Sequence, residues 1–248
     1  MRFRLATCAI AVLLSLNSLA QQPAPTLTPD QAREQYRASK AATLRDDFGE
    51  LARYRAANAA LNPPAPGENR VVFFGDSITD IWHLDEYFPG KPYINRGIGG
   101  QTTPQMLIRF RQDVIDLHPK VVVILAGTND IAGNTGPITL KAIEENFASM
   151  AEIAQGNGVR IVLSSVLPAF DYPWRHGQEP VEKIAALNSW LKDYATSHRL
   201  VYLDYYTAMQ DARHGLPPEL SGDGVHPSLA GYAVMQPLAE KAIAQAQR

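Results

Sequence analysis

The sequence predicts an α/β protein: a three-layer α/β/α sandwich around a five-stranded parallel sheet, preceded by a helical arm. From Arg70 onward, short apolar runs rich in β-branched residues alternate with longer stretches of helical pattern. The apolar runs are nearly continuous, which is typical of strands that are buried on both faces. The chain has 248 residues, 46% of them hydrophobic, which is enough for one domain with a sizeable core.

The start of the chain, residues 1–20, has the pattern of a secretory signal peptide. Arg2 and Arg4 give it a positive start, an apolar run follows, and Ser18–Ala20 offers the small residues that a signal peptidase requires. The apolar run is too short for a comfortable membrane span. We therefore expect a secreted or periplasmic mature chain without a membrane span. The single cysteine, Cys8, lies in this segment, so the mature chain would contain no disulfide.

Residues 21–69 are expected to form a leader and a helical arm outside the main fold. A Pro-rich leader ends at Thr28, whose hydroxyl can cap a helix, with Pro29 in the first position and Gln31 completing a capping box. A long helical pattern then runs to Leu61, with a break expected near Gly49. The pattern does not indicate what the arm packs against.

Residues 70–248 form the predicted α/β domain. Strands are expected over residues 71–75, 93–95, 121–127, 160–166 and 200–204, and helices over residues 103–117, 138–155, 180–197 and 228–247. In a sheet of this kind, ligand sites form at the carboxyl ends of the strands. The residues that directly follow each strand are therefore the first candidates for chemistry.

Charge and composition exclude several kinds of partner. The formal net charge is −2 and no long basic run occurs, so nothing in the sequence favours nucleic acid or an anionic membrane as a partner. No metal is expected, because none of the six histidines forms a His-x-x-x-His pair. Asp130, which follows the third strand, is expected to cap a helix. The oligomeric state is not indicated.

No cofactor is expected either. The glycine-rich segment "NRGIGGQTT" follows the second strand and lets the backbone approach a ligand closely. It lacks the Lys-Ser/Thr of a phosphate-binding loop and the third spaced glycine of a dinucleotide site. A flexible turn is the alternative for this segment.

Two further strand ends carry candidate polar groups. The segment "GDSITD" places Ser77 directly after a tight turn, where a serine taken alone is most often a helix N-cap. The segment "AGTND" places Asn129 at the end of the third strand. Its amide could donate to an anionic oxygen, or it could form an ordinary Asx-turn.

Near the C-terminus, Asp223 and His226 lie three residues apart in "LSGDGVHPSLAGY". A serine hydroxyl becomes a good nucleophile when a base takes its proton and a third group orients that base. Ser77, His226 and Asp223 supply these three roles. The N–H groups of Ser77 and Gly100 and the amide of Asn129 could then stabilise the oxyanion of a tetrahedral intermediate.

Taken together, these segments resemble the four blocks of the SGNH, or GDSL-type, hydrolase superfamily. The blocks read "FGDSIT", "NRGIGG", "GTND" and "DGVHP", and the resemblance covers roughly residues 70–239. The segments "GIGGQTT" and "GTND" look closest to the branch of platelet-activating-factor acetylhydrolase-like proteins and bacterial acyl esterases. The resemblance implies a flavodoxin-like fold, ester hydrolysis through an acyl-enzyme, and Gly100 as the oxyanion glycine, with Gly99 as its competitor. The helical arm lies outside the family pattern.

The loop "LPAFDYPWRHGQEP" after the fourth strand carries aromatic residues. We expect Trp174 and Tyr172 to bind substrate, although such a loop could equally pack onto the edge of the sheet. No long apolar lid is evident, so we expect a short acyl group, such as acetyl, on a carbohydrate or small ester. Two alternatives remain open at this point: an acyltransferase that uses the same triad, and a non-catalytic carbohydrate-binding protein.

Overall fold

The computed structural model describes residues 28–248. The chain divides into two compact units between Ala42 and Thr43. The predicted signal peptide, residues 1–20, and the Pro-rich leader after it lie outside the described residues. Helix α1 (Pro29–Asp46) begins in the first unit and ends in the second.

Helix α1 begins at the capping box that the sequence predicts. The hydroxyl of Thr28 accepts the N–H of Gln31 at 3.3 Å, and the side-chain oxygen of Gln31 accepts the N–H of Thr28 at 2.9 Å. Backbone N–H groups at a helix start have no partner within the helix, so this reciprocal pair satisfies two of them.

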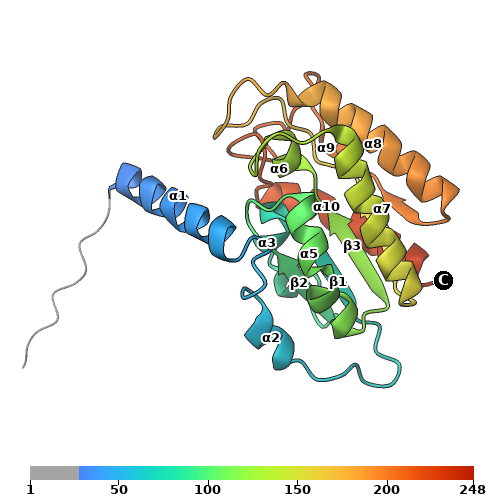
Figure 1. The fold of residues 1–248 in the computed structure, drawn as a ribbon. Coiled ribbons are helices and arrows are strands. Elements are labelled where there is room, and N and C mark those ends of the chain that lie inside the picture. The colour runs from blue at the N-terminus through green and yellow to red at the C-terminus, as the bar shows by residue number, and fades with distance from the viewer. Residues whose placement is uncertain (1–27) are drawn as a thin grey trace, which may run out of the picture. The chain divides into compact units, whose positions relative to one another are not determined.

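The second unit is built on a five-stranded sheet in which all strands are parallel (Figure 1). The strands are β1 (Val71–Gly75), β2 (Tyr93–Gly97), β3 (Val121–Leu125), β4 (Arg160–Ser164) and β5 (Val201–Leu203). Their order is β2-β1-β3-β4-β5, which is the flavodoxin-like order of a doubly wound sheet. The predicted five-stranded parallel sheet is therefore confirmed.

Helices cover both faces of this sheet (Figure 1). The helices of the second unit that flank the sheet are α3 (Ser77–Asp80), α4 (Leu84–Tyr87), α5 (Thr103–Asp113), α6 (Thr128–Ile131), α7 (Leu140–Gly156), α8 (Pro180–Ser197), α9 (Tyr206–Met209) and α10 (Leu229–Ala246), with a 3-10 turn at η1 (Ile115–Leu117). Successive strand residues point to opposite faces. Val72 and Phe74 pack with α5, α7 and α8, whereas Val71 and Phe73 pack with α3, α4, α9 and α10. The predicted three-layer sandwich is confirmed.

The helical pattern of the arm breaks close to where the sequence predicts. Helix α1 ends at Asp46, near the break expected at Gly49, and the second part of the pattern forms only the single turn α2 (Arg55–Ala59). The carboxylate of Asp47 accepts the N–H groups of Leu51 and Ala52, both at 2.9 Å, and so offers this backbone an alternative to helical bonding.

Residues 47–62, which we call the strap, bond to α5 and to edge strand β2. The side-chain amides of Gln105 and Gln112 donate to the carbonyl oxygens of Phe48 and Leu51, at 2.7 and 2.9 Å. The hydroxyl of Tyr54 donates to the backbone of β2. The second compact unit runs from Thr43 to Arg248 and therefore includes the strap.

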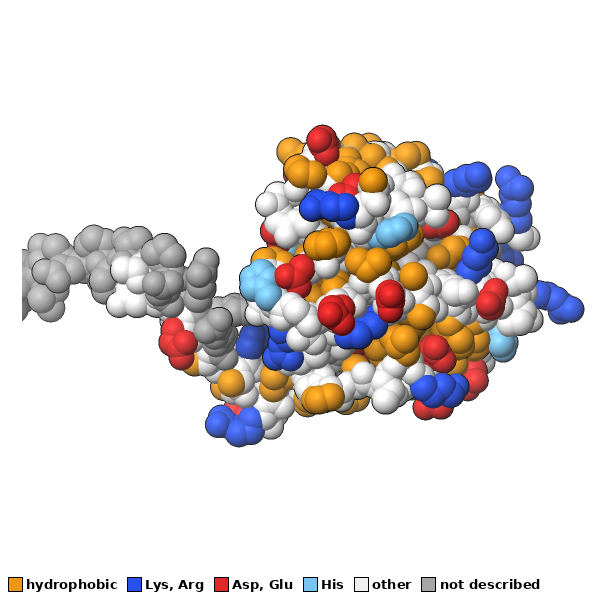
Figure 2. All heavy atoms as spheres, turned by 90° about the horizontal axis from the view of Figure 1, so that it is seen from above, with side chains coloured by type: hydrophobic (Ala, Val, Ile, Leu, Met, Phe, Trp, Pro, Cys, Tyr) orange, Lys and Arg blue, Asp and Glu red, His pale blue; other side chains and the backbone are white. Residues whose placement is uncertain are grey.

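None of the helices within residues 28–248 combines the length and hydrophobicity that a membrane crossing needs. Figure 2 views the molecule from above, the side on which α6 and α9 lie in Figure 1. Hydrophobic side chains on this face are interspersed with charged side chains of both signs, and histidines are among them.

Candidate active site

Ser77 lies at the carboxyl end of β1, where the chain turns directly into α3. Gly75 permits this turn, because a Cβ there would lie 2.2 Å from the hydroxyl of Thr79 and 2.6 Å from a backbone oxygen of β3. Asp76 is the N-cap of α3, and its side chain accepts the N–H of Ile78 at 3.0 Å. Ser77 is therefore the first residue of the helix rather than its cap, and its hydroxyl is free to meet another group.

The structure brings Ser77, His226 and Asp223 together. The hydroxyl oxygen of Ser77 is 2.9 Å from His226 Nε2, and His226 Nδ1 is 2.7 Å from Asp223 Oδ2. A carboxylate only accepts hydrogen bonds when ionised, so we assign the proton of the neutral imidazole to Nδ1. Nε2 is then free to accept the proton of the serine hydroxyl.

The carboxylate of Asp223 is held in its ionised form. Partial burial acts to raise its pKa, but hydrogen bonds from the His226 side chain and from the N–H groups of His226 and Val225 outweigh that effect and lower the pKa to about 2. The backbone bonds, at 2.8 and 2.9 Å, go to Oδ1, which leaves Oδ2 for the imidazole.

Two residues outside the predicted set hold the histidine loop in place. Ser221 is buried, and its hydroxyl donates to the carbonyl of His226 at 2.7 Å while accepting the N–H of Gly224 at 2.9 Å. The hydroxyl of Tyr232 in α10 donates to the carbonyl of Ile78 in α3 at 2.6 Å. Helix α10, which follows His226, is thereby hydrogen-bonded to α3, the helix that carries Ser77.

The glycine loop contains one N–H group without a hydrogen-bond partner among the described residues. Gly99 donates its N–H to the Asp80 carboxylate at 3.0 Å. Gly100 has a φ of +80°, a backbone conformation that favours glycine, and no described residue accepts its N–H. Of the two candidate glycines, Gly100 is thus the one whose N–H is available to a ligand.

Asn129 lies in α6, directly after β3, and its side chain is buried. Its Nδ2 donates to the carbonyl of Gln101 at 3.0 Å, and its Oδ1 accepts from Asn134 at 2.8 Å. An amide nitrogen carries two hydrogens. Within the described part of the chain, the second hydrogen of Asn129 has no acceptor, so it remains available as a donor.

Asp130 has the capping role that the sequence predicts. Its carboxylate accepts the N–H of Thr103 at 3.0 Å and the hydroxyl of Thr103 at 2.6 Å, at the start of α5. Burial raises the pKa of Asp130 to about 6, against the lowering effect of these bonds. Across residues 28–248, no group of three or more side chains is placed to hold a metal ion.

The two aromatic residues predicted to bind substrate are placed differently. Trp174 is 40% exposed, and its ring centroid lies 6.0 Å from that of His226. Tyr172 is fully buried, with its ring 5.1 Å from that of Trp174 and its hydroxyl 3.5 Å from that of Thr128. Without exposed surface, Tyr172 can act on a ligand only by supporting Trp174.

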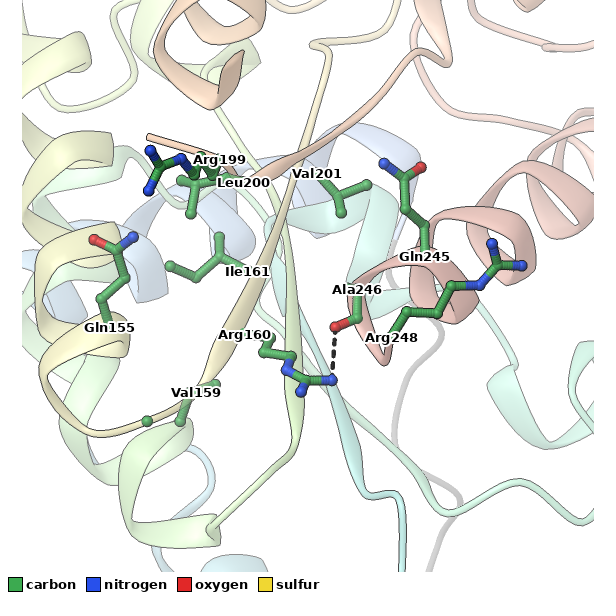
Figure 3. A pocket seen from close by; sticks show the side chains of 11 residues that line it. Gln155, Val159, Arg160, Ile161, Arg199, Leu200, Val201, Gln245, Ala246 and Arg248 are labelled. Atoms are coloured by element: carbon green, nitrogen blue, oxygen red, sulfur yellow. Dashed lines mark hydrogen bonds between the residues drawn. The ribbon is translucent and has the colours of Figure 1, made fainter. Parts of the chain in front are cut away.

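A hollow in the protein surface lies away from the residues described so far. Figure 3 shows its lining side chains, which include Arg160, Arg199 and Val201. Arg160 begins β4 and Val201 begins β5, so the hollow is at the amino ends of parallel strands. Ser77 follows the carboxyl end of β1, and the hollow is therefore at the opposite edge of the sheet.

Comparison with known proteins agrees with the fold and with the motif blocks. The model of the GDSL-like Lipase/Acylhydrolase family matches residues 73–234. A GDSL-like lipase from Bacteroides thetaiotaomicron superposes with a TM-score of 0.78 at 43% identity, over 81% of this chain and 100% of that chain.

Two curated proteins are also similar in sequence. The uncharacterized lipoprotein YqeF of Bacillus subtilis is 30% identical over 129 residues, which are 44% of this chain and 53% of that protein. The chain thus matches about half the length of YqeF. An acetylxylan esterase of Geobacillus stearothermophilus is 24% identical over 197 residues, which are 67% of this chain and 90% of that protein.

The fold and the family match define the class of the protein as carboxylic ester hydrolase. The chain belongs to the GDSL-like lipase/acylhydrolase family, because the family model covers well over half of it. The resemblance to SGNH hydrolases drawn from the four sequence blocks is thereby confirmed.

Proposed function

We propose that this protein hydrolyses carboxylic esters with Ser77 as nucleophile, His226 as general base and Asp223 as the group that orients the base. The observation that carries the proposal is the pair of contacts from Ser77 to His226 at 2.9 Å and from His226 to Asp223 at 2.7 Å. The serine and histidine are 149 positions apart in the chain. Hydrogen-bond reach between nucleophile, base and orienting group is the geometry this chemistry requires.

In the first half of the reaction, Ser77 Oγ attacks the acyl carbonyl carbon and its proton passes to His226 Nε2. The carbonyl oxygen becomes an oxyanion, which accepts hydrogen bonds from the Ser77 and Gly100 N–H groups and the Asn129 amide. The C–O bond to the alcohol then breaks, and the leaving oxygen takes the proton from Nε2. Ser77 is left as an acyl ester.

In the second half, water attacks the acyl-enzyme and gives a proton to His226 Nε2. The second tetrahedral intermediate collapses, the carboxylic acid leaves, and the proton returns to Ser77 Oγ. Asp223 stays ionised throughout, since its pKa is about 2, and its negative charge stabilises the imidazolium that forms in each half.

For the substrate, we propose a short acyl ester, such as acetyl, on a carbohydrate or other small alcohol. Two observations support this class. Trp174 presents exposed aromatic surface beside His226, where the alcohol part would leave, and aromatic faces pack well against the C–H faces of sugars. A relative at 24% identity is an acetylxylan esterase. We also propose export through the signal peptide, residues 1–20, which would bring the enzyme to such substrates outside the cell.

The proposal is tested by replacing the nucleophile. Ser77→Ala should lower the hydrolysis of p-nitrophenyl acetate by about 10⁴-fold or more, with an unchanged thermal midpoint. The matched control is Ser197→Ala, because the hydroxyl of Ser197 bonds only at the exposed end of α8, to Tyr194 and to the neighbouring His198. Substantial turnover by folded Ser77→Ala would overturn the proposal.

The substrate class is tested separately on the wild-type protein. A series of p-nitrophenyl esters from acetyl to octanoyl should show the highest kcat/KM at the short end, and acetylated xylan should release acetate. A preference for octanoyl over acetyl would contradict the short-acyl assignment without affecting the assignment of Ser77.

A further inference from the structure

Asn134 lies between two of the three residues that supply the proposed oxyanion donors, Gly100 and Asn129, and the exposed Trp174. Its Nδ2 donates to Asn129 Oδ1 at 2.8 Å and to the carbonyl of Gly100 at 3.3 Å. Its Oδ1 accepts the indole N–H of Trp174 at 3.0 Å. Its backbone N–H donates to the carbonyl of Asn129 at 3.0 Å. One side chain thus contacts three groups of the proposed site.

We propose that Asn134 is a positioning residue that holds the Asn129 amide and the Gly100 loop in the geometry needed to bind the oxyanion, and that links both to Trp174. This inference rests on the proposed function. It assigns a role to a residue that none of the four sequence blocks includes.

Asn134 fixes the orientation of the Asn129 amide. A rotation of 180° would exchange its oxygen and nitrogen at little steric cost. In the observed orientation, Oδ1 faces the Nδ2 of Asn134 and Nδ2 faces the carbonyl of Gln101. After rotation, two donors would face each other at one end and two acceptors at the other. Asn134 therefore helps to keep the N–H of Asn129 directed into the site.

Asn134 also holds the glycine loop in place. Glycine rotates about its backbone bonds with almost no steric restraint, so an oxyanion donor on a glycine needs bonds from outside the loop. The carbonyl of Gly100 accepts from Asn134, and the next carbonyl, of Gln101, accepts from Asn129. The two asparagines thus fix consecutive peptide groups beside the N–H of Gly100.

The loop that carries Trp174 is bonded to the same region. The indole N–H bonds to Asn134, and the guanidinium of the next residue, Arg175, donates to the carbonyl of Gly133 at 2.6 Å. The loop after β4 is therefore fastened to residues 133–134 at two points. A substrate that packs against Trp174 would therefore contact the indole ring whose N–H bonds to Asn134. Asn134 is in turn the residue that we propose to position the oxyanion donors.

A residue that only stabilised the turn would change folding stability and leave the chemical step alone. A positioning residue affects the step in which the oxyanion forms, and so changes kcat more than KM. It also acts through Asn129, and its effect should therefore depend on whether Asn129 is present. A double-mutant cycle in kcat measures that dependence.

The experiment compares wild type, Asn134→Ala, Asn129→Ala and the double variant with p-nitrophenyl acetate. Asn129→Ala should lower kcat by about 10²–10³-fold, the cost of one oxyanion donor, and Asn134→Ala by about 10- to 100-fold with KM changed by less than about threefold. In the Asn129→Ala background, Asn134→Ala should cost less than about threefold. Asn157→Ala is the control, because its amide bonds only to the exposed end of α7 and kcat should not change.

A second variant keeps the test decisive if Asn134→Ala fails to fold. Trp174→Phe retains an aromatic ring but removes the indole N–H that bonds to Asn134. It should lower kcat several-fold, and this loss should vanish in the Asn129→Ala background. If the losses in kcat of the single variants multiply in the double variant, the two residues act independently and the positioning role is wrong. It is also wrong if only the thermal midpoint or only KM changes.

The two proposals fail in different ways. If Ser77→Ala keeps its activity in the same assay, the proposed function falls, and the role of Asn134 falls with it. If Ser77→Ala is inactive while Asn134→Ala has wild-type kcat, only the role of Asn134 falls.

Discussion

The carboxylate of Asp223 shows how hydrogen bonds can keep an exposed group charged. Its side chain is 41% exposed, yet three hydrogen bonds from the imidazole and the backbone lower its pKa to about 2. A carboxylate with such a pKa is ionised at every pH above about 4. The negative charge beside His226 is therefore constant over the range in which an ester hydrolase is assayed.

This constancy predicts the pH profile of the enzyme. Asp223 should add no ionisation step to kcat/KM at any pH above about 4, because its pKa is about 2. The measurement is kcat/KM for p-nitrophenyl acetate from pH 4.5 to 9. An acid limb that needs two protons would count against this pairing.

Asp76 is the opposite case. Burial raises its pKa to about 7, against the lowering effect of the Ile78 N–H, and within the described residues its Oδ2 has no hydrogen-bond partner. In the unfolded chain the group ionises near 3.8. As the pH rises from about 4 to about 7, the unfolded state releases its proton and the folded state retains it, so the folded state loses relative stability.

Asp76→Asn should therefore stabilise the fold in a pH-dependent manner. Asparagine keeps an oxygen for the Ile78 N–H and has no charge to desolvate. Its gain in free energy of unfolding over wild type should grow between pH 4 and 7 and then level off, with an upper limit of about 4 kcal/mol. Urea unfolding at pH 4.5, 6 and 8 measures this gain, with exposed Asp46→Asn as control. A gain independent of pH would contradict the account.

Among single residues, sequence reasoning finds the groups that we propose to react but misses the groups that we propose to position them. Ser77, Asn129 and His226 stand in motif blocks, and the structure places each of them at the predicted edge of the sheet. Asn134 lies five residues beyond its block and looks like a turn residue. Only the fold shows that its amide meets Trp174, 40 positions away.

The burial of Arg109 could not be predicted from the sequence either. It is fully buried in α5, where it pairs with Asp113 at 3.1 Å and donates to the backbone carbonyls of Gly75 and Arg96 at the ends of β1 and β2. An arginine in an amphipathic helical pattern is ordinarily solvent-exposed. Its burial depends on carbonyl oxygens from two strands, which no local pattern reports.

Among the elements, the strap is the one whose packing the sequence did not indicate. The side-chain amide of Gln101, in the glycine loop, donates to the carbonyl of Gly49, at 3.2 Å. Asn58 bonds on both sides: its Nδ2 donates to Asp113 at 2.7 Å and its Oδ1 accepts from Arg96 at 2.8 Å. These contacts are polar, so no hydrophobic periodicity in the strap indicates where it packs.

Asn58→Ala should weaken the attachment of the strap. It removes a donor from Asp113 and an acceptor from Arg96, both largely buried, and should lower the free energy of unfolding by about 1–3 kcal/mol. Exposed Asn157→Ala is the matched control and should change it by less than about 0.5 kcal/mol. Urea unfolding of both variants measures the difference, and equal effects would show that the strap contributes no stability through this residue.

Helices packed on the sheet were predicted more accurately than the N-terminal arm. The predicted helix over residues 180–197 coincides with α8, since its apolar face is buried along its whole length. The helix predicted to reach residue 117 ends at Asp113 and continues as the 3-10 turn η1. The arm breaks near Gly49 as predicted, where the carboxylate of Asp47 competes with helical backbone bonds, but beyond the break only the single turn α2 forms.

For the molecule as a whole, the fold class follows from strands that are apolar on both faces. Burial on two faces requires helices on both sides, and parallel strands place their carboxyl ends at one edge. The position of the site follows from that topology. The beginning of the compact unit at Thr43 does not, because it depends on the contacts of the strap.

Export can be tested on the whole chain. If residues 1–20 are a signal peptide, the protein recovered from the periplasm or medium of an expressing bacterium should begin at Gln21. Intact mass and N-terminal sequencing measure this. Replacing Arg2 and Arg4 by glutamate should retain the unprocessed chain inside the cell, and recovery of exported protein that still begins at Met1 would contradict the prediction.

The most direct test of Ser77 as the nucleophile is to trap it covalently. Incubation with p-nitrophenyl diethyl phosphate should release one equivalent of p-nitrophenolate per chain and abolish esterase activity. Peptide mass spectrometry should then find a single diethylphosphoryl group, on Ser77, and none on His226→Ala protein treated for the same time. Complete inactivation with the label on another residue, or with no label on Ser77, would contradict the account.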